Sequence, residues 1–192
     1  THVAGKVDPI NDIEVINLEL ILADMESVDK RLDRVTKMLR QKDPDAIVEA
    51  PILTKLKEAF ENELPARSVE LSEDELELIK GMHLLTIKPM LYVANVAEDE
   101  IADTENNEYV NKVREFAKQD NAEVIVVCAR IEEEMAELDD EDKEMFLEEL
   151  GIQESGLDLL IKATYSLLGY ATYFTAGVQE VRAWTFRKGM KA

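Results

Sequence analysis

The stretch Leu91-Tyr92-Val93-Ala94-Asn95-Val96-Ala97-Glu98 decides the fold, because a short apolar run ends here in an Asn-x-x-Glu motif. The runs Met90 to Ala94 and Val124 to Val127 are nearly all apolar and β-rich, which is typical of parallel strands buried on both faces. Between them, apolar residues at helical spacing predict a helix from about Asn107 to Gln119. Strand, helix and strand in this order predict a right-handed, parallel βαβ unit.

Two short segments follow the predicted strands, and both are candidates for ligand binding. In a parallel α/β sheet, ligands bind beyond the carboxyl ends of the strands. Asn95-Val96-Ala97-Glu98 and Cys128-Ala129-Arg130 should therefore lie side by side at one rim. The amide of Asn95 can donate and accept along the Hoogsteen edge of a purine, and the second segment can offer backbone groups to the same base. The alternative is a strand-ending turn without a ligand.

The phosphate half of a nucleotide site is missing from the sequence. A P-loop needs glycines that free backbone N–H groups, a lysine that reaches the phosphates, and a hydroxyl that binds magnesium. Gly5-Lys6 is followed by Val7, the chain has only seven glycines, and no two of them form a G-x-G pattern. We therefore expect the base-reading half of a site alone.

The first third of the chain is strongly helical. Asn11 and Glu14 resemble a capping box, and a helix from about Asn11 to Gln41 would be roughly 45 Å long. Lys42-Asp43-Pro44-Asp45 predicts a turn, and Pro51 either starts or kinks the returning helix. The heptad spacing indicates an antiparallel two-helix coiled coil. Its expected core residues are Leu18, Ile21, Met25, Val28, Leu32, Val35 and Leu39 on the first helix, and Ile52, Leu53, Leu56 and Phe60 on the second.

Further elements are expected on either side of the predicted strands. Ser72 and Glu75 form a capping box that should begin a short helix. Glycines stand at plausible C-cap positions after two later helices. The tail is β-like, with its best strand at residues 183–186. The expected ranges are helices over Glu73–Gly81, Asp140–Leu150 and Gly156–Leu168, with glycines at Gly151 and Gly169, and a β-like tail over Tyr170–Ala192.

A basic cluster stands out near the tip of the predicted coiled coil. A solvated helix face is its ordinary explanation, but an RNA- or ribosome-facing patch with salt-sensitive phosphate contacts is the functional alternative. The cluster comprises Lys30, Arg31, Arg34, Lys37 and Arg40, with Lys42, Lys55 and Lys57 nearby.

Composition limits the remaining functions. The net charge is −20, from 22 basic and 42 acidic residues, which argues against nucleic-acid binding by the whole surface. A single cysteine, Cys128, excludes an intramolecular disulfide and fits a cytoplasmic protein. No apolar run is long enough to span a membrane. Asp139 to Asp142 lacks the calcium-loop pattern, and His2 and His83 lack partners at metal-ligand spacing, so no metal site is expected.

Several strings together resemble the YchF-type Obg-like ATPases, a branch of the P-loop GTPase class. They occur in the family's order over nearly the whole chain. They are His2-Val3-Ala4-Gly5-Lys6-Val7-Asp8-Pro9, Asp12-Ile13-Glu14, Thr86-Ile87-Lys88-Pro89, Asn95-Val96-Ala97-Glu98, Ala136-Glu137-Leu138-Asp139-Asp140, Tyr173-Phe174-Thr175-Ala176-Gly177 and Glu180-Val181-Arg182-Ala183-Trp184-Thr185.

The resemblance implies a nucleotide-binding hydrolase that prefers ATP over GTP, uses Mg²⁺, and acts at the ribosome in translation or stress regulation. Asn95 would contact the adenine and Val96 would meet it through backbone groups, while Glu98 replaces an aspartate that reads guanine in related proteins. Cys128-Ala129 matches the second base loop, where the family usually has Ser-Ala; the cysteine leaves only a backbone contact secure.

The resemblance also implies a domain plan: an α/β fold containing the C-terminal part of a P-loop GTPase-like sheet, an inserted helical coiled coil, and the start of a β-grasp (TGS) domain. We expect a connection over 1–23, the coiled-coil arm over 24–81, the base-binding part over 82–169, and the TGS start over 170–192. The P-loop, switches and magnesium ligands would lie upstream, so the chain is expected to be an internal fragment without catalytic residues and inactive by itself. The alternative is a non-enzymatic coiled-coil module that binds RNA or protein. The sequence leaves open the oligomeric state, the physiological partner and the trigger of hydrolysis.

Overall fold

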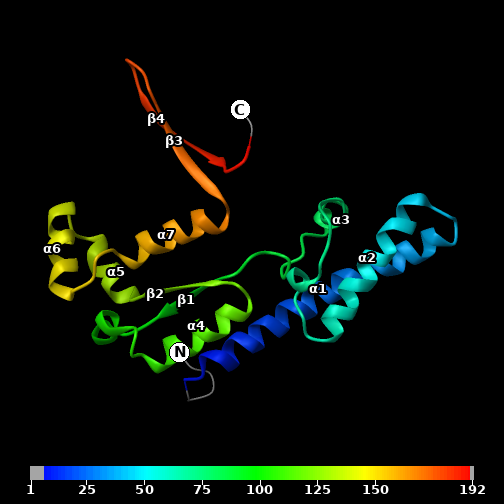
Figure 1. Ribbon diagram of the computed structural model, residues 1–192, viewed down its shortest axis with the longest axis horizontal. Helices are drawn as coiled ribbons and strands as arrows, with labels where there is room; N and C mark the ends of the chain where they lie inside the picture. The colour runs from blue at the N-terminus through cyan, green and yellow to red at the C-terminus, as the bar shows by residue number, and fades with distance from the viewer. Residues whose placement is uncertain (1–6, 191–192) are drawn as a thin grey trace. The chain divides into compact units, whose positions relative to one another are not determined.

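The computed structural model describes residues 7–190 and divides the chain into two units, Thr1–Pro89 and Met90–Ala192 (Figure 1). The string from His2 to Lys6, which contributes to the family resemblance, lies outside the described residues, as do the last two residues of the predicted β-like tail.

The first unit begins with the long helix α1, Pro9–Leu39. Its cap is Asp8, whose carboxylate accepts the Asn11 N–H at 3.3 Å, so the prediction of Asn11 as the cap is wrong. Pro9 explains the difference: its fixed φ suits the first helical position, where a missing N–H costs nothing. The helix ends at Leu39, two residues before the predicted end.

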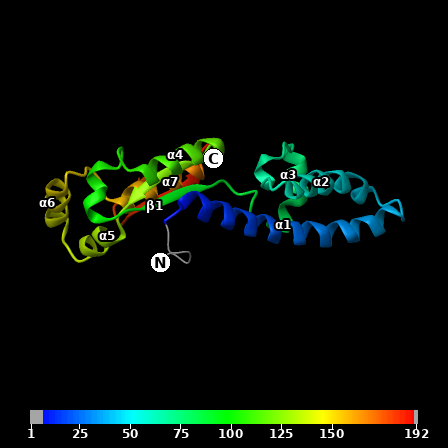
Figure 2. The same ribbon diagram turned by 90° about the horizontal axis from the view of Figure 1, so that it is seen from below.

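Helix α2, Pro44–Glu61, returns along α1 after a short turn (Figure 2). Asp43 caps it by accepting the N–H groups of Asp45 and Ala46, and Pro44 occupies the first turn. The possibility that Pro51 starts this helix is wrong, because Pro51 lies in its interior.

The heptad stripe forms the core of this helical hairpin, as predicted. Ile21, Val28 and Val35 are buried, and Met25, Leu32 and Leu39 are partly buried against them. Leu18 departs from the prediction, since its side chain is 40% exposed. The second helix contributes the four predicted residues, all buried: Ile52, Leu53, Leu56 and Phe60.

A segment of short elements follows the hairpin: η1 (Ala66–Ser68), α3 (Glu73–Ile79) and η2 (Lys80–Met82). The predicted capping box at Ser72 and Glu75 is present in both directions, and the α-helix ends two residues before Gly81.

The buried carboxylate of Asp24 on α1 holds the end of this segment. It accepts the Leu85 N–H at 2.8 Å, and the Thr86 N–H and hydroxyl at 2.7 Å each. The same hydroxyl accepts the Ala66 N–H at 2.9 Å. Thr86 therefore joins α1 to η1 through one buried network.

The second unit contains the predicted parallel βαβ arrangement: β1 (Leu91–Asn95), α4 (Glu108–Gln119) and β2 (Glu123–Val127). Leu91 pairs with Glu123 and Asn95 with Val127. A 3₁₀ segment, η3 (Glu98–Asp103), links β1 to α4.

Helices pack against both faces of this two-stranded sheet. Tyr92 on one face meets Phe116 of α4 edge-on, and on the other face α7 (Gly156–Leu167) approaches Val127. The prediction that both strands are buried on both faces is wrong for β1, where Tyr92 is 8% exposed but Val93 is 47% exposed. Neighbouring residues of a strand point to opposite faces, so only one face of β1 is fully covered.

The remaining helices are α5 (Ala129–Ala136) and α6 (Asp140–Leu150). Helix α6 matches its predicted range, and α7 ends one residue before its predicted end. Gly151 and Gly169 have positive φ angles of 71° and 65°, as left-handed residues after a helix require. The β-like tail forms an antiparallel hairpin of β3 (Tyr170–Ala176) and β4 (Val181–Arg187). Its assignment to a TGS domain, and the four domain ranges, stay predictions.

Candidate functional site

The two predicted loops meet at the rim where β1 and β2 end. The side-chain oxygen of Asn95 accepts the backbone N–H of Ala129 at 2.9 Å, and the Val96 N–H donates to the Val127 carbonyl at 2.9 Å. The parallel pairing of the strands thus continues past their ends. The contact between Asn95 and Ala129 spans 34 residues of sequence.

The hydrogen bond from Ala129 fixes which way the Asn95 amide faces. Because its oxygen accepts from the protein, its NH₂ group is left to donate outward from an exposed side chain. A donor aimed from a strand end suits a ring nitrogen acceptor such as purine N7. The rim therefore presents an oriented N–H donor.

Glu98 begins η3 beside this donor and lies near a cation. Its carboxylate is 3.7 Å from the Arg130 Nε, which also donates to Glu134 at 3.2 Å. The pKa of Arg130 is raised, chiefly because Glu134 accepts its hydrogen bond and secondly because Glu98 is close. All three side chains are well exposed, so the pairs are screened by water.

Cys128 and Ala129 lie at the start of α5, a helix that the sequence analysis did not predict. The prediction of a loop here is wrong: Cys128 caps α5 and Ala129 is its first residue. Cys128 is 3% exposed and packs with Ile131 and Met135. The i, i+4 spacing of Ile131 and Met135 is the signal that could have indicated this short helix.

A hollow of about 600 Å³ opens at the rim. It brings together all five residues predicted to read the base. Its lining is Asn95, Val96, Ala97, Glu98, Asp99, Cys128, Ala129, Arg130 and Leu150. Across residues 7–190, no group of three or more His, Cys, Asp or Glu side chains could hold a metal ion.

The basic cluster on the helical hairpin separates into two kinds of residue. Arg31 donates to both carboxylate oxygens of Glu49 at 2.6 and 2.8 Å, and Lys30 pairs with Glu26. Hydrogen bonding to Glu49 raises the pKa of Arg31. Two of the accompanying lysines are also paired, whereas part of the cluster is exposed and has no carboxylate partner among the described side chains. The paired lysines are Lys55 and Lys57, and the residues without a partner are Arg34, Lys37, Arg40 and Lys42.

Comparisons with known proteins agree with the motifs. No family model matches the chain. The chain is 72% identical over 192 residues to the ribosome-binding ATPase YchF of Bacillus subtilis and 47% identical over 191 residues to that of Escherichia coli O157:H7. In each case the alignment covers 100% of this chain and 52% of the relative.

A solved structure also matches over the whole chain. It is that of the Schizosaccharomyces pombe YchF GTPase, with a TM-score of 0.86 at 32% identity, covering 100% of this chain and 52% of the other. The resemblance to YchF-type proteins is thereby confirmed. The chain spans about half the length of the relatives it matches. Among the described helices, none is long and apolar enough to cross a membrane.

Proposed function

We propose, since this chain belongs over its whole length to the family of YchF-type proteins, that it supplies the base-recognition rim of a nucleotide hydrolase that prefers ATP over GTP. The observation that carries the proposal is the hydrogen bond between Asn95 and Ala129, which joins the end of β1 to the start of α5 at one edge of the sheet. The names of the relatives, ribosome-binding ATPases, support the same assignment and a place of action at the ribosome.

Adenine would be recognised by donors and backbone groups. The Asn95 NH₂ group would donate to N7, and the backbone at Val96 would meet the ring. Guanine reading in related proteins uses a carboxylate that accepts from N1–H and N2–H₂, groups that adenine does not offer. Glu98 faces Arg130 at 3.7 Å, which reduces its value as an acceptor for guanine. These features together favour adenine.

The phosphates and Mg²⁺ would be bound elsewhere in the full-length protein. The sequence has no P-loop, and the described residues have no cluster of metal-ligating side chains. Mg²⁺ bound with ATP would neutralise phosphate charge during hydrolysis. The part of this chain's residues is to bind and orient the base.

The test is calorimetric titration of the full-length protein with ATP and with GTP. Replacing Asn95→Ala should weaken ATP binding by roughly 10- to 100-fold, which corresponds to the about 1–3 kcal/mol of a good base contact. Asn106→Ala is a matched control, because among the described residues the exposed Asn106 amide donates only to Asp103. ATP binding within about twofold of the parent protein in the Asn95 variant would refute the assignment.

The isolated chain provides a second test. Base contacts of roughly 1–3 kcal/mol fall short of the about 4 kcal/mol that millimolar affinity needs. The 192 residues alone should therefore show neither measurable ATP binding nor Mg²⁺-dependent hydrolysis. Turnover by the pure chain would contradict the proposed division of the site.

A ribosome- or RNA-binding role of the helical hairpin is the second candidate function. Its support is the set of exposed cations without carboxylate partners in the described part of the chain, Arg34, Lys37 and Arg40. Unpaired cations are free to contact phosphates, and such contacts weaken as salt rises.

Changing Arg34, Lys37 and Arg40 together to glutamine should reduce ribosome co-sedimentation and flatten its salt dependence. The matched control is the triple variant Lys30→Gln, Lys55→Gln and Lys57→Gln, which removes the same number of charges from lysines already paired with carboxylates. If the first triple variant retains both the affinity and the salt slope of the parent, the hairpin does not bind through these charges. If the full-length protein binds the ribosome but does not bind ATP, the alternative of a non-enzymatic interaction module is favoured.

A further inference from the structure

The outer edge of β2 is open. In a parallel pair, the N–H and C=O of one residue point to the same side, and successive residues alternate. The Val127 carbonyl accepts from Val96 of β1, so the backbone groups of Ile125, two residues earlier, also face β1. Val124 and Val126 therefore point their backbone groups away from β1. Within residues 7–190, no hydrogen bond from another element reaches them.

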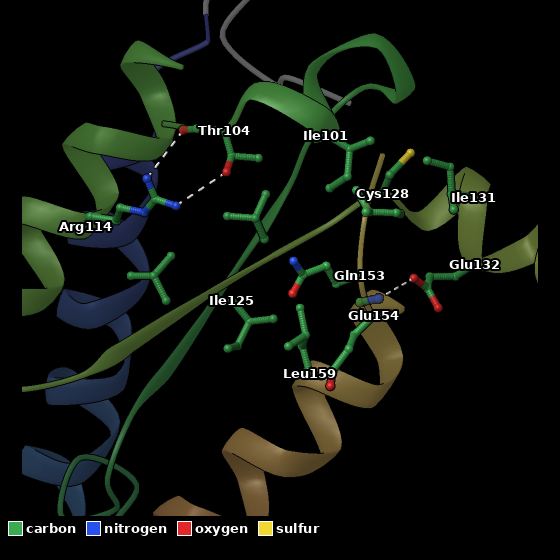
Figure 3. Close-up of a pocket in the computed structure, with 14 residues that line it drawn as sticks. Ile101, Thr104, Arg114, Ile125, Cys128, Ile131, Glu132, Gln153, Glu154 and Leu159 are labelled. Carbon is green, nitrogen blue, oxygen red and sulfur yellow. Dashed lines mark hydrogen bonds between the residues drawn. The ribbon is translucent and has the colours of Figure 1, made fainter. Parts of the chain in front are cut away.

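A groove of about 580 Å³ runs along this edge (Figure 3). One wall comes from η3 and α4, with Ile101, Thr104 and Arg114, and the floor is the edge of β2. The other wall comes from α5, α7 and the segment before α7. Its residues are Ile131, Glu132, Ile152, Gln153, Glu154, Gly156 and Leu159.

The edge lacks the usual protection against strand addition. Natural edge strands carry lysines, prolines or bulges that prevent pairing with another chain. The strand Glu123-Val124-Ile125-Val126-Val127 has none of these and is rich in β-branched residues. An extended segment laid in the groove would complete the ladder at Val124 and Val126, as in β-augmentation.

Charge indicates the kind of segment that fits. The guanidinium of Arg114 already forms an ion pair with Glu105 at 3.1 Å and donates a hydrogen bond to the carbonyl of Thr104. Glu132 uses one carboxylate oxygen for the Gly156 N–H, which leaves the other available. Glu154 stands on the same wall; one of its carboxylate oxygens accepts from Lys162 Nζ at 2.6 Å, and the other has no partner among the described side chains. Helices α5 and α6 beyond it are strongly acidic. Two copies of a chain with net charge −20 would repel each other, so the complementary occupant is a basic segment of another protein.

We propose that the open edge of β2 binds an extended, basic polypeptide segment as an added strand. Side chains of an added strand alternate between the two walls. Lysine or arginine side chains would face Glu132 and Glu154, and the intervening apolar side chains would face Ile101 on the opposite wall. The hydrogen-bond ladder supplies affinity and the acidic wall selects the partner.

The probe for this site is a fluorescein-labelled heptapeptide of alternating valine and lysine, titrated against the full chain by fluorescence anisotropy. Two isomers are compared, one N-methylated on its valines and the other on its lysines. Only one set of N–H groups can face β2, so one isomer should lose at least tenfold in affinity and the other should stay within about threefold of the parent peptide. Equal binding of the parent and both isomers would reduce the contact to simple charge attraction and overturn the proposal.

Variants of the chain test the acidic wall and guard against misfolding. Glu154→Gln should weaken the peptide by about three- to tenfold, whereas Glu133→Gln, an equal charge change outside the groove lining, should leave it nearly unchanged. Amide hydrogen exchange on the unmodified chain should show at least tenfold added protection at Val124 and Val126, and little at Ile125. Equal losses in the two variants, or protection without this alternation, would contradict strand addition.

Discussion

The buried network around Asp24 predicts a large loss of stability when its carboxylate is removed. Asp24 is 2% exposed and accepts three hydrogen bonds, one from the Leu85 N–H and two from Thr86. Hydrogen bonds to a charged group contribute about 1.5–3 kcal/mol each, and a donor left buried without an acceptor costs about 1–3 kcal/mol. Because the contributions of hydrogen bonds that share one acceptor group are not additive, Asp24→Ala should lower the free energy of unfolding by about 3–5 kcal/mol. That loss is a large share of the free energy of unfolding of a typical domain, which is roughly 5–15 kcal/mol.

Urea unfolding followed by far-ultraviolet circular dichroism measures this effect, because the long helices α1 and α2 dominate the signal. Thr86→Val should cost about 1–3 kcal/mol, since it removes one donor to Asp24 and the acceptor for the Ala66 N–H. Asp29→Ala is the matched control: its carboxylate is 45% exposed and pairs with Lys57, so at most about 1 kcal/mol is expected. If Asp24→Ala costs no more than Asp29→Ala at an unchanged m-value, the reasoning about the buried network fails.

Three further predictions concern packing, pH and a buried charge. Gly156→Ala would place a methyl group 2.8 Å from a β2 side chain and should cost about 1–3 kcal/mol of unfolding free energy, whereas Gly81→Ala meets nothing within 4 Å and should cost little. The pKa of Glu75 is lowered, chiefly because its carboxylate accepts the backbone N–H of Ser72. The stability that ionised Glu75 contributes is therefore complete above its unfolded pKa of about 4.3 and is lost as the pH falls through the folded pKa. Glu75→Gln should abolish this contribution to the pH dependence of thermal melts. Arg31→Ala leaves the carboxylate of Glu49, 8% exposed, without its partner and should cost about 1–3 kcal/mol by urea titration, while a change below about 0.5 kcal/mol would show that water replaces the pair.

Elements with strong periodicity could be predicted from the sequence. The heptad of α1, the capping box of α3 and the β-branched runs of β1 and β2 carry local signals that packing then reinforces. The start of α1 could not be placed, because two capping patterns overlap. Asp8 with Pro9 competes with Asn11, and only the folded backbone shows which acceptor is used.

The rim residues were predicted by type and spacing, but their contacts were not. Nothing local indicates that the Asn95 amide oxygen would be occupied by an N–H from α5, since the two groups are 34 residues apart. This contact changes the chemistry, because it leaves the amide as a donor rather than as a two-way reader of the purine edge. The short helix after β2 was missed because its one signal, the pair Ile131 and Met135 four residues apart, is weak within a segment of eight residues.

The basic cluster illustrates how pairing across two helices alters a prediction made from one. On the sequence, eight cations gather near one turn, and nothing distinguishes them. In the folded hairpin, Arg31 meets Glu49 and Lys57 meets Asp29, over 18 and 28 residues of sequence respectively. Only cations without such partners can release counterions fully when they contact phosphate. The salt dependence of ribosome binding should therefore reflect about half of the cluster, the part near the turn that includes Arg34 and Lys37, and a slope that demands all eight charges would contradict this pairing.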